Sequence, residues 1–298
     1  MPDSLPLQQM PTPTKFQQQF YWEDFTKKIL RDWGFFETYS HSLINKSLQD
    51  LSGKTALKLK NPLSQDWLYL RTDLIFSVLN IIAQNQDKKE KLSLFEMANV
   101  YLSRKDDLPQ EELKLTAVIN HSDFYTLKGY LESLAEQMGI KLGFEGKDYP
   151  QLFQKGIGAK ILVDKQEIGY LGQINSKLQE NLQIKNTVWG FELNFMQLAK
   201  FASKNKVYTP IPKYPAIVER LTFFNPKAKE YSLIYQSAIK THQLIKQVTL
   251  ADNYQDKLSL EIHYLDPQKN LSDKDIAPIR KKLVANIEKL GLKLQGEI

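Results

Sequence analysis

The stretch KLSLEIHYL, residues 257–265, decides the fold of the last third of the chain. Its apolar residues alternate with polar ones, Leu258, Leu260, Ile262 and Tyr264 against Ser259, Glu261 and His263. Because successive side chains of a strand point to opposite faces, this alternation predicts a strand with one buried face. The polar side chains are therefore expected on the exposed face of a sheet.

The segments around this strand form a regular series. RLTFF predicts a strand, KEYSLIYQSAIKTHQLI a helix, QVTLADNY a strand, LSDKDIAPIRKKLVANIEKLG a helix and LKLQGEI a last strand. Ser272 and Asp275 form a capping-box pattern at the second helix, where Pro278 either kinks the helix or moves its start. The order βαββαβ is the ferredoxin-like arrangement, and an open sheet face of this kind is a common platform for single-stranded RNA.

A proline-rich segment precedes this domain. In SKNKVYTPIPKYPAIVERL, Pro210, Pro212 and Pro215 remove backbone donors, which favours a linker. Upstream, helical patterns (residues 21–35, 70–86, 123–140) mix with strand patterns (residues 36–44, 91–102, 158–164, 166–174, 188–195). This mixture predicts an α+β domain with a large antiparallel sheet. We therefore expect two domains, residues 1–205 and 206–298.

Composition sets the class of protein. The chain has 298 residues, of which 42% are apolar and 25% charged, as in soluble globular proteins. It has no run near the roughly 18 apolar residues of a membrane span and no secretory signal pattern. The absence of cysteine excludes disulfides, thiolate metal sites and cysteine nucleophiles. We expect a cytoplasmic protein.

The net charge of +6 is unevenly distributed. Residues 1–205 carry 25 Lys and Arg against 24 Asp and Glu, whereas residues 206–298 carry 15 against 10. The last third therefore holds +5 of the charge and is the candidate polyanion binder. Solvated lysines on helix faces would give a similar count.

Several chemistries have no sequence support. The histidines, His41, His121, His242 and His263, are scattered without ligand spacing, so no metal site is expected. The glycines of GIGAKILVDKQEIGYLG match neither a P-loop nor a dinucleotide fingerprint. The pairs Asp106-Asp107 and Glu111-Glu112 are expected in a solvated hairpin loop.

Seven blocks of sequence resemble, in order and spacing, the C-terminal half of the bacterial phenylalanine–tRNA ligase beta subunit family. They are GFFETYSHSLI, NPLSQDWLYLRTDL, LFEMANVYL, DFYTLKGYLESLAEQMGI, IGYLGQI, WGFELNF and PIPKYPAIVERLTFF. The tail resembles the ferredoxin-fold anticodon-binding domain of that family. The family's N-terminal half, with its editing domain, has no counterpart here, so we expect a truncated or split form without editing.

The resemblance implies a class II synthetase-like core without catalysis. The catalytic alpha subunit would use ATP and magnesium, no cofactor is expected in this chain, and the two subunits would form a heterotetramer. A class II site needs arginines for the ATP phosphates, but LFEMANVYL and IGYLGQINSKL contain none. Arg71 is therefore expected to cap a carbonyl, to pair with a carboxylate such as Asp66 or to line the subunit interface. Apolar surface for the partner is expected on helices at residues 21–33 and 75–83.

The resemblance also implies a tRNA-binding surface on the tail. Ser259 matches the family position that meets the anticodon, although it also fits an ordinary surface serine, and Lys257, Lys269 and Lys293 are expected near phosphates. Lys269 and Gln295 stand where the family has arginines, so a weaker RNA contact than in typical members is expected.

Two other functions remain open. A stand-alone RNA-binding or regulatory synthetase paralogue would bind tRNA as a monomer, without an alpha subunit. A small-molecule sensor would need a glycine-rich loop after the first strand of the tail, and NPKAKEY does not supply one.

Overall fold

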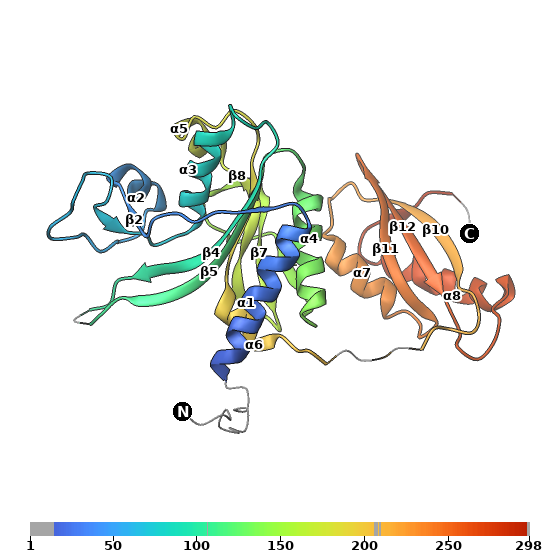
Figure 1. Cartoon of the computed structure of the whole chain (residues 1–298). Helices are drawn as coiled ribbons and strands as arrows, with labels where there is room; N and C mark the ends of the chain where they lie inside the picture. The colour runs from blue at the N-terminus through green and yellow to red at the C-terminus, as the bar shows by residue number, and fades with distance from the viewer. Residues whose placement is uncertain (1–14, 106, 206–207, 209, 297–298) are drawn as a thin grey trace, which may run out of the picture. The chain divides into compact units, whose positions relative to one another are not determined.

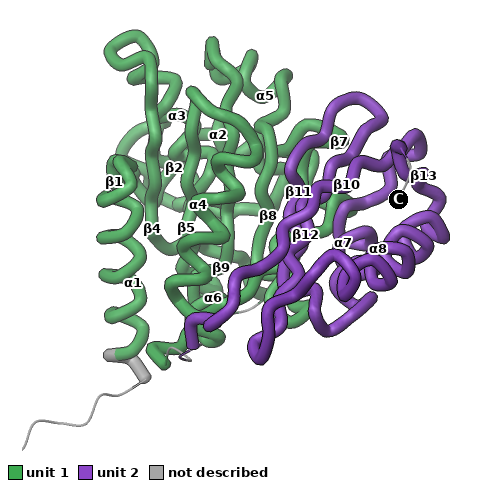
Figure 2. Tube along the Cα trace, turned by 90° about the vertical axis from the view of Figure 1, so that its right-hand side faces the viewer, with its two compact units in different colours: residues 1–206 green, residues 207–298 purple. Residues whose placement is uncertain are grey.

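The structure is a computed structural model that describes residues 15–105, 107–205, 208 and 210–296. The chain divides into two compact units, residues 1–206 and residues 207–298 (Figure 2). Each unit has hydrophobic core residues of its own. In the part of the chain that the structure describes, no helix is long and apolar enough to cross a membrane.

The first unit is built on a mixed sheet (Figure 1). It has seven strands in the order β1-β4-β5-β9-β8-β7-β6. The strands are β1 (Phe36–Glu37), β4 (Ser93–Leu102), β5 (Gln110–Ile119), β6 (Gly143–Glu145), β7 (Phe153–Val163), β8 (Gln166–Ile174) and β9 (Trp189–Asn194). All neighbours are antiparallel except β1 and β4, which run parallel. The predicted α+β class is confirmed, and the sheet departs from the antiparallel pattern only at this edge.

Helices cover the two faces of this sheet differently. The helices are α1 (Lys15–Asp32), α2 (Lys46–Ser52), α3 (Ile75–Asn85), α4 (Phe124–Gln137), α5 (Ser176–Asn181) and α6 (Phe195–Phe201). Residues of α1, α4 and α6 share one core cluster with the strands. Residues of α2, α3 and α5 share a second cluster with other residues of the strands. A short sheet of β2 (Leu43–Ile44) and β3 (Tyr69–Leu70) lies next to α2 in the chain.

Helix α3 is buried within its own unit. Its Val78, Leu79 and Ile82 are fully buried, because the helix is apolar on nearly every side. Gly190 of β9 lets it approach the sheet, since a Cβ there would lie 3.3 Å from Ile75 Cδ1. The prediction that residues 75–83 expose apolar surface to a partner is therefore wrong.

Two further local predictions need correction. Residues 36–44 form two short strands rather than one, because the chain between them turns to let Ser40 bond to Glu96. Glu111 and Glu112 lie in β5 and not in a loop, and Glu112 pairs with Lys114 at 3.0 Å. Asp106, the other carboxylate expected in that loop beside Asp107, lies outside the described residues.

The second unit has the predicted ferredoxin-like order. Its elements are β10 (Ile217–Phe224), α7 (Tyr231–Ile239), β11 (Ile245–Tyr254), β12 (Lys257–Tyr264), α8 (Asp273–Glu288) and β13 (Lys293–Leu294). The strands form an antiparallel sheet with the order β11-β12-β10-β13. The predicted apolar positions of β12 are all buried and share a core with α7 and α8.

The start of α8 resolves an alternative that the sequence left open. Ser272 and Asp275 form the predicted capping box, and the helix begins at Asp273. Pro278 lies inside the helix, so it does not move the helix start. The capping contacts satisfy backbone donors that the first turn leaves without partners.

Close packing at Gly169 of β8 gives a stability prediction. A Cβ at this position would lie 2.6 Å from Leu193 Cα and closer still to the Glu192 carbonyl. Because backbone cannot move aside cheaply, Gly169→Ala is expected to destabilise the chain by about 1–3 kcal/mol. Gly129 of α4 is the matched control, since nothing lies within 4 Å of a Cβ there. Gly129→Ala is expected to stabilise by about 0.5–1 kcal/mol in urea unfolding, and equal destabilisation by both changes would contradict the packing argument.

Candidate functional site

The sheet of the second unit has one face covered by helices and one open face. Successive side chains of a strand point to opposite faces of a sheet, and the register of β10, β11, β12 and β13 shows which residues lie opposite each other. The side chains on the face opposite α7 and α8 can therefore be assigned strand by strand. We call the following residues the open face: Val218, Arg220, Thr222, Phe224, Gln247, Thr249, Asp252, Tyr254, Lys257, Ser259, Glu261, His263 and Lys293.

Three of the four predicted RNA-contacting residues lie on the open face. Lys257 and Lys293 are both paired in register with Phe224, one on each side of β10. The Lys257 ammonium lies 5.6 Å from the centre of the Phe224 ring. Ser259 is on the same strand as Lys257, two residues along. The fold therefore gathers two cations and a hydroxyl at one end of the face.

Lys269 lies elsewhere, in the connection between β12 and α8. Its ammonium is 3.0 Å from Asp275 Oδ1, and this hydrogen bond raises the pKa of Lys269. Hydrogen bonds from Ser272 and Lys269 lower the pKa of Asp275 to about 2. Lys269 is thus engaged with the cap of α8 and is not part of the open face.

Ser259 is less accessible than its alternation predicts. Its side chain is on the expected face, but the residue is only 9% exposed. Its Oγ shares a 2.8 Å hydrogen bond with Thr222 Oγ1 on the neighbouring strand β10. A ligand that uses this hydroxyl would meet the Ser259–Thr222 pair together.

The sequence reasoning missed two aromatic residues of the open face. Phe224 is 37% exposed and Tyr254 is 66% exposed, and both are paired with Lys257 in register. For Phe224 the signal was available, because it has the parity of Arg220 and Thr222 in its strand. Tyr254 has the parity of the apolar Val248 and Leu250 in the sequence, and only the register shift between Leu250 and Asp252 brings it to the open face. Exposed aromatic rings can stack on nucleic-acid bases, and a lysine beside them can neutralise a phosphate.

A charge cluster lies toward the other end of the open face. Arg220 Nη2 is 3.3 Å from Glu261 Oε2, and His263 Nε2 is 3.1 Å from Glu261 Oε1. The hydrogen bonds from His263 and then Arg220 lower the pKa of Glu261. The carboxylate is therefore held charged and engaged with Arg220 and His263.

Arg71 is a buried structural residue of the first unit. Its Nε donates to the Asn99 carbonyl at 2.9 Å, and its Nη1 donates to Ser40 Oγ and Glu96 Oε1 at 2.8 and 3.1 Å. Arg71 thus both caps a carbonyl and pairs with a carboxylate, as expected, but the carboxylate is Glu96 on β4 and not Asp66. The side chains of Arg71 and Glu96 are 2% and 1% exposed, so Arg71 cannot reach a ligand at the surface.

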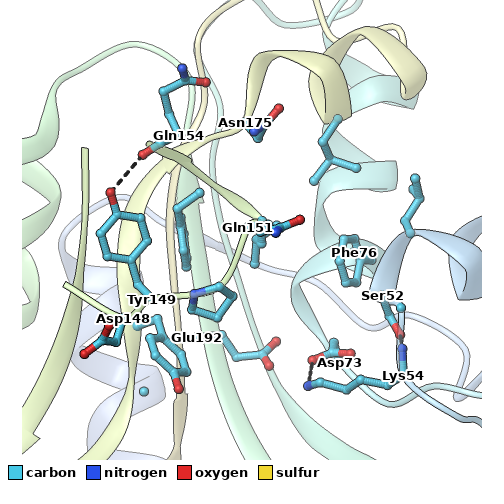
Figure 3. Close-up of a pocket in the computed structure, with 18 of the residues that line it drawn as sticks. Ser52, Lys54, Asp73, Phe76, Asp148, Tyr149, Gln151, Gln154, Asn175 and Glu192 are labelled. Atoms are coloured by element: carbon cyan, nitrogen blue, oxygen red, sulfur yellow. Dashed lines mark hydrogen bonds and ion pairs between the residues drawn. The ribbon is translucent and has the colours of Figure 1, made fainter. Parts of the chain in front are cut away.

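A cavity of about 1360 Å³ lies against the sheet of the first unit (Figure 3). Residues of β5, β7, β8, β9, α3, α5 and the loop at 146–152 line it, and none of its described lining residues is an arginine. Among residues 15–105, 107–205, 208 and 210–296, no cluster of side chains suits a metal ion. The cavity therefore lacks the guanidinium groups that hold a nucleoside triphosphate.

Two further features distinguish this cavity from a nucleotide site. The N-terminus of α3 is already occupied, because Glu192 Oε2 accepts from Leu74 N and Ile75 N at 2.8 and 2.7 Å. The helix end is thus not free to bind a phosphate. The surface of the sheet at Gly158 is covered by the Tyr149 ring, since a Cβ on Gly158 would lie 2.7 Å from that ring.

Comparisons with known proteins agree with this architecture. The family model described as "Phenylalanyl tRNA synthetase beta chain CLM domain" matches residues 1–195. The chain is 29% identical over 329 residues to the phenylalanine–tRNA ligase beta subunit of Carboxydothermus hydrogenoformans, covering 99% of this chain and 40% of that protein. It is 26% identical over 287 residues to the same subunit of Thermotoga maritima, covering 88% and 36%.

The chain therefore spans about two fifths of the length of the curated relatives that it matches. Among solved structures it is similar to a pyrrolysyl-tRNA synthetase of Desulfitobacterium hafniense, with a TM-score of 0.49 and 14% identity. That similarity covers 63% of this chain and 73% of the other.

Proposed function

We propose a function that starts from one premise: the chain belongs to the phenylalanyl-tRNA synthetase beta chain family, through its class II synthetase-like domain. The chain acts as a non-catalytic beta-type subunit of phenylalanine–tRNA ligase. It assembles with a catalytic alpha subunit, which uses ATP and magnesium, and it binds tRNA(Phe) through residues 206–298. The two units thus have separate roles, one in assembly and one in RNA binding.

The observation that carries the RNA-binding role is the composition of the open face. Lys257 and Lys293 flank Phe224, and Tyr254 lies on the other side of Lys257. Cations position a phosphate backbone, whereas aromatic rings stack on unpaired bases. A single-stranded loop such as an anticodon offers both groups at once. The Ser259–Thr222 hydroxyl pair lies beside them as a candidate base-edge contact.

The absence of catalysis rests on the cavity of the first unit. Its described lining contains no arginine, Glu192 occupies the N-terminus of α3 and Tyr149 covers Gly158. An adenylation site must instead neutralise the phosphates of ATP in the transition state. We therefore assign the chemistry of the ligase to the partner subunit.

The assembly role is supported by apolar side chains around α1 and β1. Tyr21 of α1 is 40% exposed, and Phe36 of β1 is 52% exposed. Tyr39, just after β1, is 96% exposed. β1 is also the edge of the sheet, where a partner can reach unpaired backbone groups. This surface replaces the α3 surface that the sequence suggested.

Addition of an alpha subunit tests the assembly and the division of labour together. The purified chain alone is expected to show no phenylalanine-dependent ATP–pyrophosphate exchange, and the complex is expected to show it. Light scattering is expected to report the mass of a heterotetramer, whose subunit interface we expect to bury on the order of 2,000 Å² or more. Exchange by the chain alone would overturn the non-catalytic assignment. If the chain stays monomeric when the alpha subunit is added but binds tRNA, the stand-alone RNA-binding paralogue would be favoured instead.

Salt titration of tRNA(Phe) binding tests the lysines of the open face. Each lysine that neutralises a phosphate contributes about 0.7–0.9 to the slope of log affinity against log salt. Lys257→Ala is therefore expected to lower the slope by about that amount. The matched control is Lys282→Ala, because Lys282 is exposed on α8 and lies outside the open face. An equal change in both variants would mean that only the net charge of the chain matters.

A further inference from the structure

The cavity of the first unit has a carboxyl group with one oxygen engaged and one free. Glu192 of β9 lies between Thr116 of β5 and Tyr170 of β8 in the register of the sheet. Its Oε2 accepts three hydrogen bonds, from Leu74 N, Ile75 N and Thr116 Oγ1. Its Oε1 has no hydrogen-bond partner within the described part of the chain, although Glu192 lines the cavity.

The charges around Glu192 are already paired with one another. Lys54 pairs with Asp73, and Figure 3 shows this pair on the Glu192 side of the cavity. Lys114 of β5 pairs with Glu112 at 3.0 Å. On β8, Glu167 pairs with Lys160 at 3.3 Å and accepts a hydrogen bond from Tyr170. Lys54, Lys114 and Lys160 therefore each have a carboxylate of their own. The other lysines of the lining are Lys147 of the loop, Lys155 of β7 and Lys177 of α5.

The protonation of Glu192 reflects this environment. Burial raises the pKa of Glu192, and the charge of Asp73 raises it further, whereas Lys114 and Lys54 only partly oppose the shift. The protein thus holds a carboxyl group whose charge is not balanced by its own cations. A cation that enters the cavity would supply that balance and favour the ionised form.

The walls of the cavity indicate what kind of cation fits. Tyr149 and Tyr170 line the cavity as partly exposed aromatic rings, and Phe76 and Phe153 line it although they are only 6% and 2% exposed. The described residues hold no cluster suited to a metal ion, and a metal would require several ligands around one point. A primary ammonium has three N–H donors, of which one can bond to Glu192 and the others to water or to further acceptors of the lining, while apolar or aromatic surface receives the rest of the molecule.

We propose that this cavity binds a small primary ammonium compound with an apolar or aromatic body, and that Glu192 Oε1 accepts its ammonium group. The site requires neither tRNA nor a partner subunit, so it stands apart from the function proposed above. Glu192 Oε2 stays bound to the N-terminus of α3, which fixes the direction of the free oxygen.

Isothermal titration of the full chain with phenethylamine tests the proposal, with phenethyl alcohol as the uncharged analogue. The amine is expected to bind at least about tenfold more tightly, since hydrogen bonds to charged groups are the stronger ones. Because Glu192 must lose its proton to accept the ammonium, amine affinity is expected to rise with pH above the ordinary glutamate value of 4.5. At pH values where Glu192 is protonated, amine binding is expected to release that proton. The measured binding enthalpy would then depend on the ionisation enthalpy of the buffer.

The variant Glu192→Gln distinguishes binding at this site from non-specific binding of the amine. Glutamine keeps an acceptor for Leu74 N and Ile75 N but carries no charge, so the preference for the amine is expected to disappear. Asp148→Asn, at another lining position, is the matched control and is expected to keep the preference. Equal binding of amine and alcohol, or an unchanged preference in Glu192→Gln, would overturn the proposal. If that variant does not fold, the absence of proton release in the unaltered chain would be equally decisive.

Discussion

Arg71→Met is expected to destabilise the chain by about 3–5 kcal/mol, because it leaves the carboxylate of Glu96 buried without its cation. The side chains of Arg71 and Glu96 are 2% and 1% exposed. Methionine has a similar length, so the loss comes from charge and hydrogen bonds rather than from a cavity. Urea unfolding followed by circular dichroism measures the change.

The position of this pair explains why the effect is large. Glu96 on β4 also accepts hydrogen bonds from Thr38 Oγ1, Ser40 N and Ser40 Oγ. Arg71 adds a bond to the Asn99 carbonyl. The network therefore fixes the segment after β1, the segment after β3 and the middle of β4 in one place. Without the guanidinium, Glu96 Oε1 loses a hydrogen bond and the cation that balances its charge. Water cannot replace them easily, because the Glu96 side chain is only 1% exposed.

An exposed ion pair of the same residue types provides the control. Arg104 and Asp107 lie 3.7 Å apart with side chains 48% and 64% exposed. Arg104→Met is expected to cost no more than about 1 kcal/mol, since solvent screens such pairs. Arg71→Met/Glu96→Gln is expected to recover part of the loss, because it removes the unpaired charge as well. Equal costs for Arg71→Met and Arg104→Met would show that burial of the pair does not matter.

Arg71 also shows what a sequence can and cannot predict about a site. The lack of arginines in the strands that would hold ATP indicated a structural role for this residue. Its partner could not be predicted, because Glu96 is 25 positions away and is brought close only by the pairing of β1 and β4 and the course of the chain after β1. Asp66 is closer to Arg71 along the sequence than Glu96 is, but the fold does not pair them. Sequence spacing carries no information about which distant carboxylate a fold brings to a buried cation.

The fold was predicted best where the hydrophobic period was strict. The alternation of β12 and the capping box of α8 predicted the second unit, since both signals depend on residues a few positions apart. In α3 the apolar pattern predicted a helix but not which partner covers it, because a helix that is apolar on most sides fits either a core or an interface. The alternation of β12 predicted that Ser259 lies on the open face. The sequence did not predict that Phe224 and Tyr254 lie close to each other, because only the register of β10, β11 and β12 brings them together.

Loss of those aromatic residues is expected to weaken tRNA binding more than loss of any lysine. Each base that stacks on an aromatic side chain contributes about 1–3 kcal/mol. Tyr254→Ala and Phe224→Ala are therefore each expected to reduce affinity for tRNA(Phe) by about that amount, and the double variant by about 2–6 kcal/mol. Filter binding or fluorescence anisotropy with the full chain measures these values at several salt concentrations.

The control for this prediction is Leu233→Ala, because Leu233 is 44% exposed on α7 and lies outside the open face. This change is expected to leave the affinity unaltered, although it also removes an exposed apolar side chain. Stacking and charge are separated by the salt series. Stacking does not release counterions, so Tyr254→Ala is expected to lower the affinity equally at every salt concentration, whereas Lys257→Ala changes the slope. If Tyr254→Ala and Phe224→Ala bind tRNA as well as the unaltered chain, the open face would contact only phosphates. Any selection among tRNAs would then have to come from elsewhere, because phosphate contacts alone carry no base sequence.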